Sequence, residues 1–538
     1  MYYRSSIGPI EKRRRRLAVS PRINLALRVV VRAELLGVGW TNVTTDVIGP
    51  ISAEYGISGG GPLDRVASIG TMGWRMRNSA RATGGLGYYT PGHANARLGW
   101  DIGIAVSLEV SYNGTTYYKF RGTLISVEPD TGLYRRRSVT CLAQDWIADA
   151  ANCLLRDMAV QNNKRSDQLV TTIVQTAHHR QPVATDFNVG QSTFAISLDN
   201  VRDESTTGLR ALADVTMAEG GYLYVKGDTT QGGTLKFEDR HARPKAASVA
   251  TFNNTMQDLE AIRSRDHIIT RANVMVHPRK LDAVATTVLW ELTPSETVPA
   301  LVPGETVAFT GLYRADSGRF ARVGGDQIVT PVATTDYLGN AASDGSGSDL
   351  TASLSLVFAS SGNSATFAFT NNHASSTIYL TKVQVRGRGI EDRFTVTVFA
   401  KDDDASNKFG ERDISYDMIF EDRLEIAKGF ADWIIDLHGG VRTVVSLTML
   451  VGPTTESATL TSVLAREPGD KITVTESMAG ITSVPYFING MRLEVRPGAG
   501  GPHILTSLVL APASQQQFWI LEDAVAGLLE TSTVLGFV

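Results

Sequence analysis

Histidine and carboxylate residues that could bind a metal occur in this 538-residue chain, but their spacing fits no metal site. His178 and His179, together with His241 and His277, lack CxxC, HExxH or a comparable ligand pattern. The acidic run at 402–404 resembles the start of a calcium loop, yet the required glycine and terminal glutamate are missing. We therefore interpret the histidines as exposed or hydrogen-bonding groups and the acidic run as a charged turn, and we expect no metal.

Two glycine-rich stretches could in principle hold phosphates or a dinucleotide. The glycines at 59–61 are followed by Pro62, without the Lys-Ser/Thr of a phosphate loop. The stretch 84–87 does not lie between a strand and a helix, as a dinucleotide site requires. No Gly-x-Ser-x-Gly elbow occurs, and no pair of carboxylates has the context of a glycosidase. The sequence predicts two flexible loops, no catalytic residue, no cofactor and no enzyme activity.

The residues with the clearest potential for contact are aromatic and lie near the C-terminus. Phe518, Trp519 and Leu521 follow the last strong strand pattern. A tryptophan in this setting packs on its own domain or docks on a neighbouring subunit, where aromatic side chains contribute much of the binding energy. We keep both interpretations and treat the three residues as a candidate interface.

A second candidate interface is a basic cluster near the N-terminus. Arg13, Arg14, Arg15 and Arg16 follow Lys12 in an arm of polar and basic residues. Such an arm is a solvated or partner-docked extension, and the alternative is contact with phosphates or with an acidic protein surface. The chain as a whole has a net charge of -3, so only a local cluster of this kind could recruit nucleic acid.

Composition indicates a multidomain globular protein. Hydrophobic residues make up 43% of the chain and charged residues 20%, enough for several cores of ordinary size. Cys141 and Cys153 are too few for a disulfide framework and have apolar neighbours, which favours buried thiols and folding in the cytosol. The sequence suggests neither a signal peptide nor a membrane span, because polar residues interrupt every apolar run.

Strand patterns dominate the first and last parts of the chain. Residues 104–112 and 115–127 flank Asn113-Gly114, the strongest hairpin signal, so these two segments should pair antiparallel. Residues 471–475, 486–495 and 504–510 alternate or are β-rich and are separated by Gly/Pro turns, which predicts a meander.

Helical patterns lie between these β-rich parts. Ser166 and Thr207 are predicted to cap two helices, the second ending at Gly220-Gly221, and Asp422 with Glu425 fits a capping box for a helix that ends near Gly439. Between 294 and 386 the chain becomes rich in Ser, Thr, Gly and Ala with short strand-like pieces. This stretch predicts an inserted β-sandwich, which is either a surface decoration or a module for weak saccharide or cell-surface adhesion.

Several of these segments, taken in order, resemble the tail hub or minor tail proteins of long-tailed bacteriophages. The resemblance rests on a Gly-Asp turn before a strand, a Tyr-Phe-Ile-Asn-Gly strand, and a last strand that runs into Ala-Pro and a Trp-x-Leu tail within 464–521. Earlier in the chain it rests on Lys-Phe-Arg-Gly-Thr-Leu-Ile at 119–125, the strand 137–146, Gly-Tyr-Leu-Tyr at 221–224 and Leu-Lys-Phe-Glu-Asp-Arg-His at 235–241. The resemblance covers most of the chain except the arm and the insertion.

The resemblance implies an α+β, mainly β protein with two tail-tube-like β-barrels, an intervening α/β domain, a helical segment and an inserted sandwich. The expected limits are 1–22 for the basic arm, 23–146 for the first barrel, 147–245 for the α/β domain, 246–293 with 387–405 and 440–512 for the second barrel, 294–386 for an Ig-like or carbohydrate-module-like sandwich, 406–439 for the helical segment, and 513–538 for a docking tail.

The resemblance also implies a function. It suggests a homotrimeric hub at the phage tail tip, assembled in the bacterial cytoplasm, that closes or adapts the tail tube and joins the distal tail protein ring to the tip. Implied partners are that ring, the tape measure protein and other tail-tip or fibre proteins, with DNA only in transit through an axial channel and weak glycan contact by the insertion. The alternative is a carbohydrate-binding surface adhesin built of several β domains.

Overall fold

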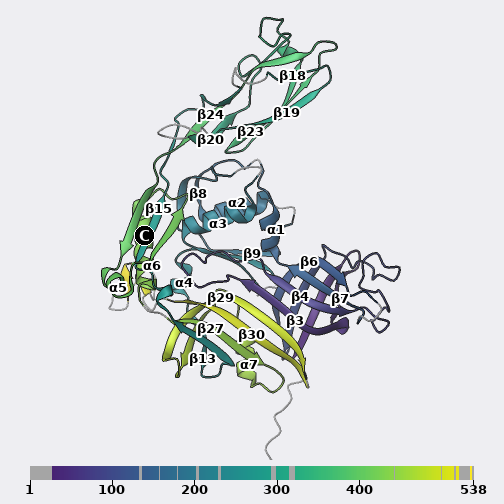
Figure 1. Ribbon diagram of the computed structural model, residues 1–538, viewed down its shortest axis with the longest axis vertical. Coiled ribbons are helices and arrows are strands. Elements are labelled where there is room, and N and C mark those ends of the chain that lie inside the picture. Colours follow the sequence, from purple (N-terminus) through teal and green to yellow (C-terminus); the bar gives the residue numbers. More distant parts are fainter. Residues whose placement is uncertain are drawn as a thin grey trace, which may run out of the picture.

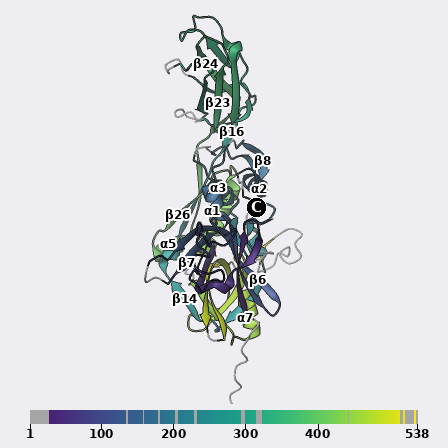
Figure 2. The same ribbon diagram turned by 90° about the vertical axis from the view of Figure 1, so that its right-hand side faces the viewer.

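The computed structural model describes most of the chain and is mainly β with seven α-helices in the described part. The described residues are 27–132, 136–156, 158–177, 180–201, 205–227, 232–292, 298–313, 322–440, 443–498, 500–513, 517–519 and 533–535. A broad body carries a narrow arm that projects from one end, and the perpendicular view shows the same elongated outline (Figures 1 and 2). None of the described helices is long and apolar enough to cross a membrane.

The N-terminal part of the body is a set of seven strands, of which β4 shows the clearest alternation of buried and partly exposed side chains. In β4, Met72, Trp74 and Met76 are buried while the residues between them are half-exposed. The Asn113-Gly114 hairpin is confirmed, since the strands on either side pair antiparallel. The strands are β1 (Arg28–Leu35), β2 (Gly39–Asn42), β3 (Val47–Gly56), β4 (Thr71–Arg77), β5 (Ala105–Tyr112), β6 (Thr115–Pro129) and β7 (Ser138–Gln144).

The C-terminal part of the body contains the predicted meander, which is confirmed. Its three strands are β28 (Lys471–Glu476), β29 (Ile481–Gly498) and β30 (Gly501–Pro512), joined by β13 (Ser248–Asn253), β14 (Asp258–Arg263) and β27 (Thr443–Val451). The helix α7 (Ser457–Leu464) contributes Leu460 and Leu464 to a core shared with Trp74 and Leu108 of the N-terminal strands.

The expected mainly β fold is confirmed, but where two tail-tube-like barrels were expected the described residues form no closed barrel. Antiparallel pairing of β3 with β29 joins the two sets of strands into one 13-stranded sheet. The main path of that sheet runs from β14 to β2, and within the described chain these two end strands do not pair with each other. The backbone N–H and C=O groups at one edge of each set form hydrogen bonds with the other set. Neither set therefore has to close into a barrel to pair that edge.

A small α/β unit lies above the sheet in Figure 1. Its third helix is capped as predicted, with Thr207 Oγ1 accepting from Arg210 N, and it ends at Gly220, whose φ is 72°. The elements are α1 (Trp146–Asn152), β8 (Gln161–Arg165), α2 (Ser166–Ala177), β9 (Ala184–Phe187), β10 (Thr193–Ser197), α3 (Gly208–Glu219), β11 (Tyr222–Lys226), β12 (Thr234–Glu238) and α4 (Ala242–Lys245).

A second small unit differs from expectation. β15 (Arg271–Val276) pairs with β25 (Val396–Lys401) and β26 (Asp413–Met418) in a sheet of their own, although the first two were expected in the second barrel and the third in a helical segment. The apolar face of α6 (Leu424–His438) covers this sheet through Phe430 and Ile434.

Two local predictions in that unit are wrong. The acidic run is not a free turn, because Asp402 caps α5 (Asp403–Phe409) by accepting from Ala405 N at 2.8 Å. The capping box before α6 does not form either, since Arg423 occupies the cap position and no side chain caps the helix. Glu421, one residue upstream of Asp422, instead accepts from Arg423 Nε at 2.8 Å.

The projecting arm is a β-sandwich in which the long strand β24 is the common partner of one layer. Its core includes the stacked rings of Phe367 and Phe369. The strands are β16 (Arg279–Leu281), β17 (Thr287–Glu291), β18 (Ala300–Leu301), β19 (Thr306–Leu312), β20 (Arg322–Val329), β21 (Tyr337–Asn340), β22 (Leu354–Ser360), β23 (Ser364–Asn371) and β24 (Ile378–Asp392). Single turns of 3-10 helix are η1 (Thr44–Asp46), η2 (Arg265–His267) and η3 (Thr351–Ser353), and a last pair of strands is β31 (Gln517–Trp519) with β32 (Thr533–Leu535).

Candidate functional site

Most of the segments that carry the sequence resemblance meet at one place, which we call the central junction: the β3–β29 seam with the buried groups of β6, β11, β12, α4 and the 466–470 turn. The strand 137–146 and the described part of the Trp-x-Leu tail do not belong to it. The seam itself is close-packed. Gly56 has a φ of 97°, and a Cβ there would lie 2.6 Å from Asn489 O. A Cβ at Gly490, its register partner, would lie 2.6 Å from Ile57 O. Because the two strands approach so closely at this register pair, both positions can hold only glycine.

A buried ion pair ties β6 to the 466–470 turn. Lys119 Nζ lies 2.6 Å from Glu467 Oε1 and also donates to Arg466 O at 2.9 Å. The second carboxylate oxygen accepts from Tyr55 Oη and from Gly227 N, each at 3.1 Å. Burial raises the pKa of Glu467, and Lys119 opposes that shift. A buried ion pair of this kind is stable only because all its partners are in place.

The same turn contacts β11 and β12 through its glycine. Gly469 has a φ of 92°, and a Cβ there would lie 1.9 Å from Tyr224 Oη. Tyr224 Oη donates to Glu238 Oε1 at 2.9 Å, and Glu238 Oε2 accepts from Arg243 Nε at 2.9 Å. The Gly-Tyr-Leu-Tyr strand is therefore hydrogen-bonded to the Leu-Lys-Phe-Glu-Asp-Arg-His strand, and the Gly-Asp turn packs directly against both.

Asn489 connects that cluster to the first glycine-rich loop. Its Oδ1 accepts from Arg243 Nη1 at 2.8 Å and its Nδ2 donates to Gly59 O at 2.5 Å. A Cβ at Gly60 would lie 2.7 Å from Leu510 O. The prediction of a flexible loop at 59–61 is wrong, because this loop is packed against β30 and anchored by a side-chain amide.

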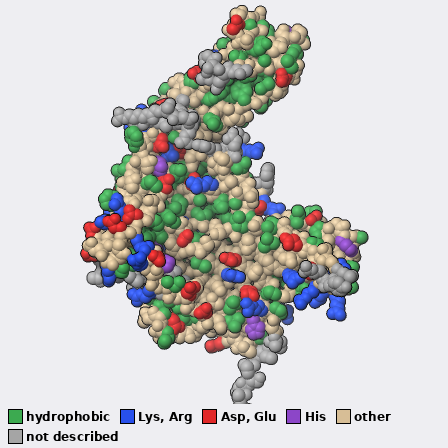
Figure 3. All heavy atoms as spheres, in the orientation of Figure 1, with side chains coloured by type: hydrophobic (Ala, Val, Ile, Leu, Met, Phe, Trp, Pro, Cys, Tyr) green, Lys and Arg blue, Asp and Glu red, His purple; other side chains and the backbone are tan. Residues whose placement is uncertain are grey.

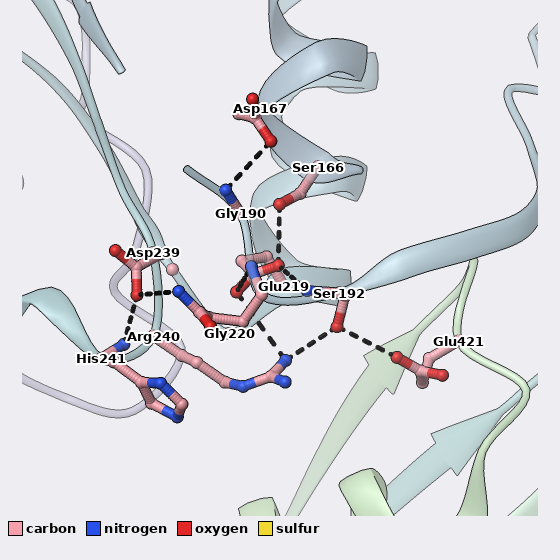
Figure 4. Close-up of polar contacts among 12 residues, drawn as sticks. Ser166, Asp167, Gly190, Ser192, Glu219, Gly220, Asp239, Arg240, His241 and Glu421 are labelled. Atoms are coloured by element: carbon pink, nitrogen blue, oxygen red, sulfur yellow. Dashed lines mark hydrogen bonds and ion pairs between the residues drawn. The ribbon is translucent and has the colours of Figure 1, made fainter. Parts of the chain in front are cut away.

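A second buried network joins the α/β unit to the α6 unit (Figure 4). Glu219 accepts from Ser166 Oγ at 2.7 Å and from Ser192 N at 2.9 Å, and its carboxylate lies 3.7 Å from Arg240. Ser192 Oγ accepts from Arg240 at 2.7 Å and donates to Glu421 at 3.2 Å. Ser166 was expected to cap α2, but its hydroxyl is used here instead.

The carboxylates of this second network are paired with arginine side chains. Burial raises the pKa of Glu219, whereas the positive charge of Arg240 lowers it. Ser166 and Ser192 donate to carboxylates, and the described chain places no histidine beside either hydroxyl to act as a base. The network fixes how the two units meet.

The outer edge of the sheet at β2 presents exposed apolar side chains. Leu36 is 78% exposed and Val38 55% exposed in the turn before β2. They border a cavity of about 510 Å³ that is also lined by Arg121, Trp146 and Arg180. At the other end of the sheet, β14 exposes Ile262. Within the described residues, both end strands thus have one backbone edge that pairs with no other strand, with apolar side chains beside it.

The residues predicted as interface fall largely outside the described chain. Arg13, Arg14, Arg15, Arg16 and Leu521 lie outside the described residues, as do His178 and His179. Phe518 and Trp519 belong to β31, which pairs parallel with β32. His241 and His277 lie apart, the latter 2.6 Å from Asp417, and the described chain has no group of three potential metal ligands.

Sequence reasoning singled out the segments of the central junction but not their interacting residues. Lys119, Glu467 and Asn489 each lie inside a quoted segment, and each is nearly fully buried. A charged or amide residue within a strand or turn of apolar neighbours was the available signal, because such a group is buried only with a partner.

Comparison with known proteins finds matches among solved structures only. No protein-family model matches the sequence, and no curated protein matches it. The structure is similar to the prophage MuSo2 43 kDa tail protein of Shewanella oneidensis, with 11% identity, coverage of 89% of this chain and 98% of that one, and a TM-score of 0.45. It is similar to a tail protein of Neisseria meningitidis MC58, with 11% identity, coverage of 90% and 96%, and a TM-score of 0.44.

A third similar structure comes from a secretion system. It is an Escherichia coli type VI secretion component that is itself described as similar to the bacteriophage T4 tail proteins gp27 and gp5. Identity is 7%, coverage is 91% of this chain and 77% of that one, and the TM-score is 0.35.

Proposed function

We propose that this chain is a structural protein of a phage tail tip: a hub that closes or adapts the tail tube, joins it to the distal tail ring and leaves an axial path for the tape measure protein and DNA. The observation that supports this proposal is the convergence of most of the phage-like segments in the central junction. Residues that carry the resemblance but are far apart in sequence, such as Lys119 and Glu467, make direct contacts there.

The proposed mechanism is geometric. The β3–β29 seam gives one chain two sets of strands side by side, and the end strands β2 and β14 leave two different edges for neighbours. Pairing of unlike edges generates a closed ring when the rotation between copies permits it. Three copies would place six sets of strands around an axis, which fits a six-fold tube. Both acidic and basic side chains are scattered over the visible body (Figure 3), so no field of one sign that would hold DNA covers the whole visible face.

The first test is the mass of the purified chain in solution. We expect a trimer, or a monomer that trimerises on a six-fold ring of the neighbouring tail protein. In a trimer, the variants Leu36→Lys and Ile262→Lys should each shift the mass to that of a monomer, because they place a charge beside an end strand. Val357→Lys is the matched control, since Val357 is 74% exposed on the sandwich, away from both edges.

The interpretation of that test needs the fold to be intact. The circular dichroism spectra of the single-site variants should match that of the parent chain, because both side chains face solvent in one copy, whereas loss of the trimer by itself lowers Tm. A parent chain that stays monomeric with every tail-tip protein, or edge variants that trimerise normally, would contradict the hub.

A second candidate function is favoured by the projecting sandwich, which stands clear of the body in both ribbon views. A carbohydrate-binding adhesin would present such an arm to a surface. Glycan binding by a persistent monomer would support this candidate, whereas a trimer that binds no glycan would favour the hub.

A further inference from the structure

Arginine side chains gather where β4 ends and β7 begins, at the right-hand end of the body in Figures 1 and 3. Arg77 is the register partner of Ser138, and Asn78 N donates to Arg137 O at 2.9 Å. Arg75 Nη2 donates to Ser138 Oγ at 2.7 Å. We call this region the arginine surface, and its members are Arg75, Arg77, Arg81, Arg97, Arg136 and Arg137.

The loop after β4 adds two members to the arginine surface. Arg97 Nη1 donates to Tyr89 Oη at 2.9 Å, and the same hydroxyl donates to Asp46 Oδ2 at 2.9 Å. Arg77 Nη1 lies 4.0 Å from Asp46 Oδ1, so Arg77 and Arg97 are held around one buried carboxylate. Arg81 is exposed in the turn with which the same loop begins.

Positive charge exceeds negative charge at the arginine surface. The described residues of 44–48, 75–103 and 126–140 contain the six arginines and four carboxylates, which are Asp46, Asp101, Glu128 and Asp130. Asp46 is 1% exposed, and Asp130 lies 3.7 Å from Arg75. Three exposed members have no carboxylate at ion-pair distance among the described residues: Arg81, Arg136 and Arg137. These three guanidinium groups remain available to an acidic partner.

Apolar and aromatic side chains lie beside the charges. Leu86 is 49% exposed and Leu98 is 76% exposed in the loop that carries Arg97. The Arg97 guanidinium carbon lies 5.4 Å from the centroid of the Tyr88 ring. Arginine next to tyrosine and exposed leucine is typical of surfaces that bind proteins. A long nucleic acid fits less well, because it would leave this end and run over the acidic side chains scattered across the body (Figure 3).

We infer that the arginine surface binds an acidic segment of another protein. Guanidinium groups bind carboxylates through paired N–H donors, and Arg81, Arg136 and Arg137 supply these donors. Arg75 and Arg97 are already held by Ser138 and Tyr89, so they lose little freedom on binding. The inference does not depend on the proposed tail function.

The test measures binding of a fluorescein-labelled hexaglutamate peptide to the full chain by fluorescence anisotropy. We expect saturable binding that weakens as NaCl rises from about 50 to about 300 mM, because salt screens exposed charges. The double variant Arg81→Glu/Arg136→Glu should raise the Kd about tenfold or more, since it places two negative charges on the surface. Arg81→Lys/Arg136→Lys should raise the Kd less, because lysine keeps the charge but loses the paired donors.

The matched control is Lys280→Glu/Lys408→Glu, which makes the same change in net charge at exposed lysines of β16 and α5. Its Kd should stay within about twofold of the parent value. Circular dichroism should be unchanged in every variant, because the substituted side chains are exposed.

Three results would overturn the inference. One is a parent chain that does not bind the peptide, and another is a control that loses as much affinity as Arg81→Glu/Arg136→Glu. The third is a labelled single-stranded DNA hexanucleotide that binds as tightly as the peptide, which would favour a nucleic-acid partner.

Discussion

Lys119 and Glu467, separated by 348 positions in the chain, form a buried ion pair with 2.6 Å between Nζ and Oε1. This contact joins the N-terminal and C-terminal strands next to their seam. Its side chains are 1% and 10% exposed, so neither charge is solvated when the other is removed.

Removal of one partner should therefore be costly. Lys119→Met should destabilise the protein by roughly 3–5 kcal/mol, because it leaves the Glu467 carboxylate buried without a counter-charge. Denaturant unfolding followed by fluorescence measures the change. The double variant Lys119→Met/Glu467→Gln should recover much of the loss, and a double variant whose cost equals the sum of the single costs would show that the two side chains do not interact.

Asp145 gives a testable pH dependence. Its carboxylate caps α1 by accepting from Ile147 N, and burial raises its pKa to about 7 from 3.8. Because the folded chain holds the proton more tightly, the stabilisation is complete below pH 3.8 and is lost as the pH rises through about 7.

The variant Asp145→Asn removes this titration and keeps the cap, since asparagine also accepts at this position. The free energy of unfolding of the parent, relative to the variant, should fall between pH 4 and pH 8 by an amount on the order of 4 kcal/mol. Chemical denaturation at a series of pH values measures the difference. A constant difference across this range would mean that Asp145 keeps an ordinary pKa in the folded protein.

Gly469 is predicted to tolerate no side chain. Its φ is 92° and a Cβ would lie 1.9 Å from Tyr224 Oη, so Gly469→Ala should cost roughly 1–3 kcal/mol or more. Tyr224→Phe removes the atom in conflict. In a double-mutant cycle, Gly469→Ala should cost less free energy of unfolding in the Tyr224→Phe background than in the parent. Additive costs of the two substitutions would show that the added methyl group does not collide with the Tyr224 hydroxyl.

The two thiols should differ in reactivity. Cys141 is fully buried in β7 and burial raises its pKa to about 12, whereas Cys153 is only partly buried. A maleimide at pH 8 should label Cys153 in the folded protein and both cysteines in denaturant. Mass spectrometry of tryptic peptides identifies the site, and rapid labelling of Cys141 in the native protein would contradict the packing of β7.

Local structure was accessible from the sequence wherever one short pattern determined it. Asn113-Gly114 predicted its hairpin, and Thr207 with Gly220 predicted both ends of α3, because turn and cap chemistry depend on neighbouring residues alone. Asp402 was misread as part of a turn and Asp422 as a cap, since a carboxylate close to a helix start is compatible with several roles.

The larger arrangement was not accessible in the same way. Two tail-tube-like barrels were expected, but the arrangement of the strands depends on which sheet edges meet, and the β3–β29 contact joins segments with no mutual signal in their composition. The partners of β15 and β25 could not be predicted either, because their alternating apolar and polar residues are compatible with a place in any sheet. The segments of the central junction could be named from the sequence, whereas the pairing of Lys119 with Glu467 required the coordinates.

The β3–β29 pairing also determines how long β3 stays without its partner strand while the chain is being synthesised. β3 ends at Gly56, and its partner strand begins only at Ile481. At about 5–20 residues per second a ribosome needs roughly 20–85 s to make the intervening chain. During that interval the nascent β3 has no partner for one edge, and an open edge accepts strands from other nascent chains. Translation of many copies on one messenger therefore favours premature pairing between chains, and slower initiation or a chaperone that covers β3 would raise the yield of correctly folded protein.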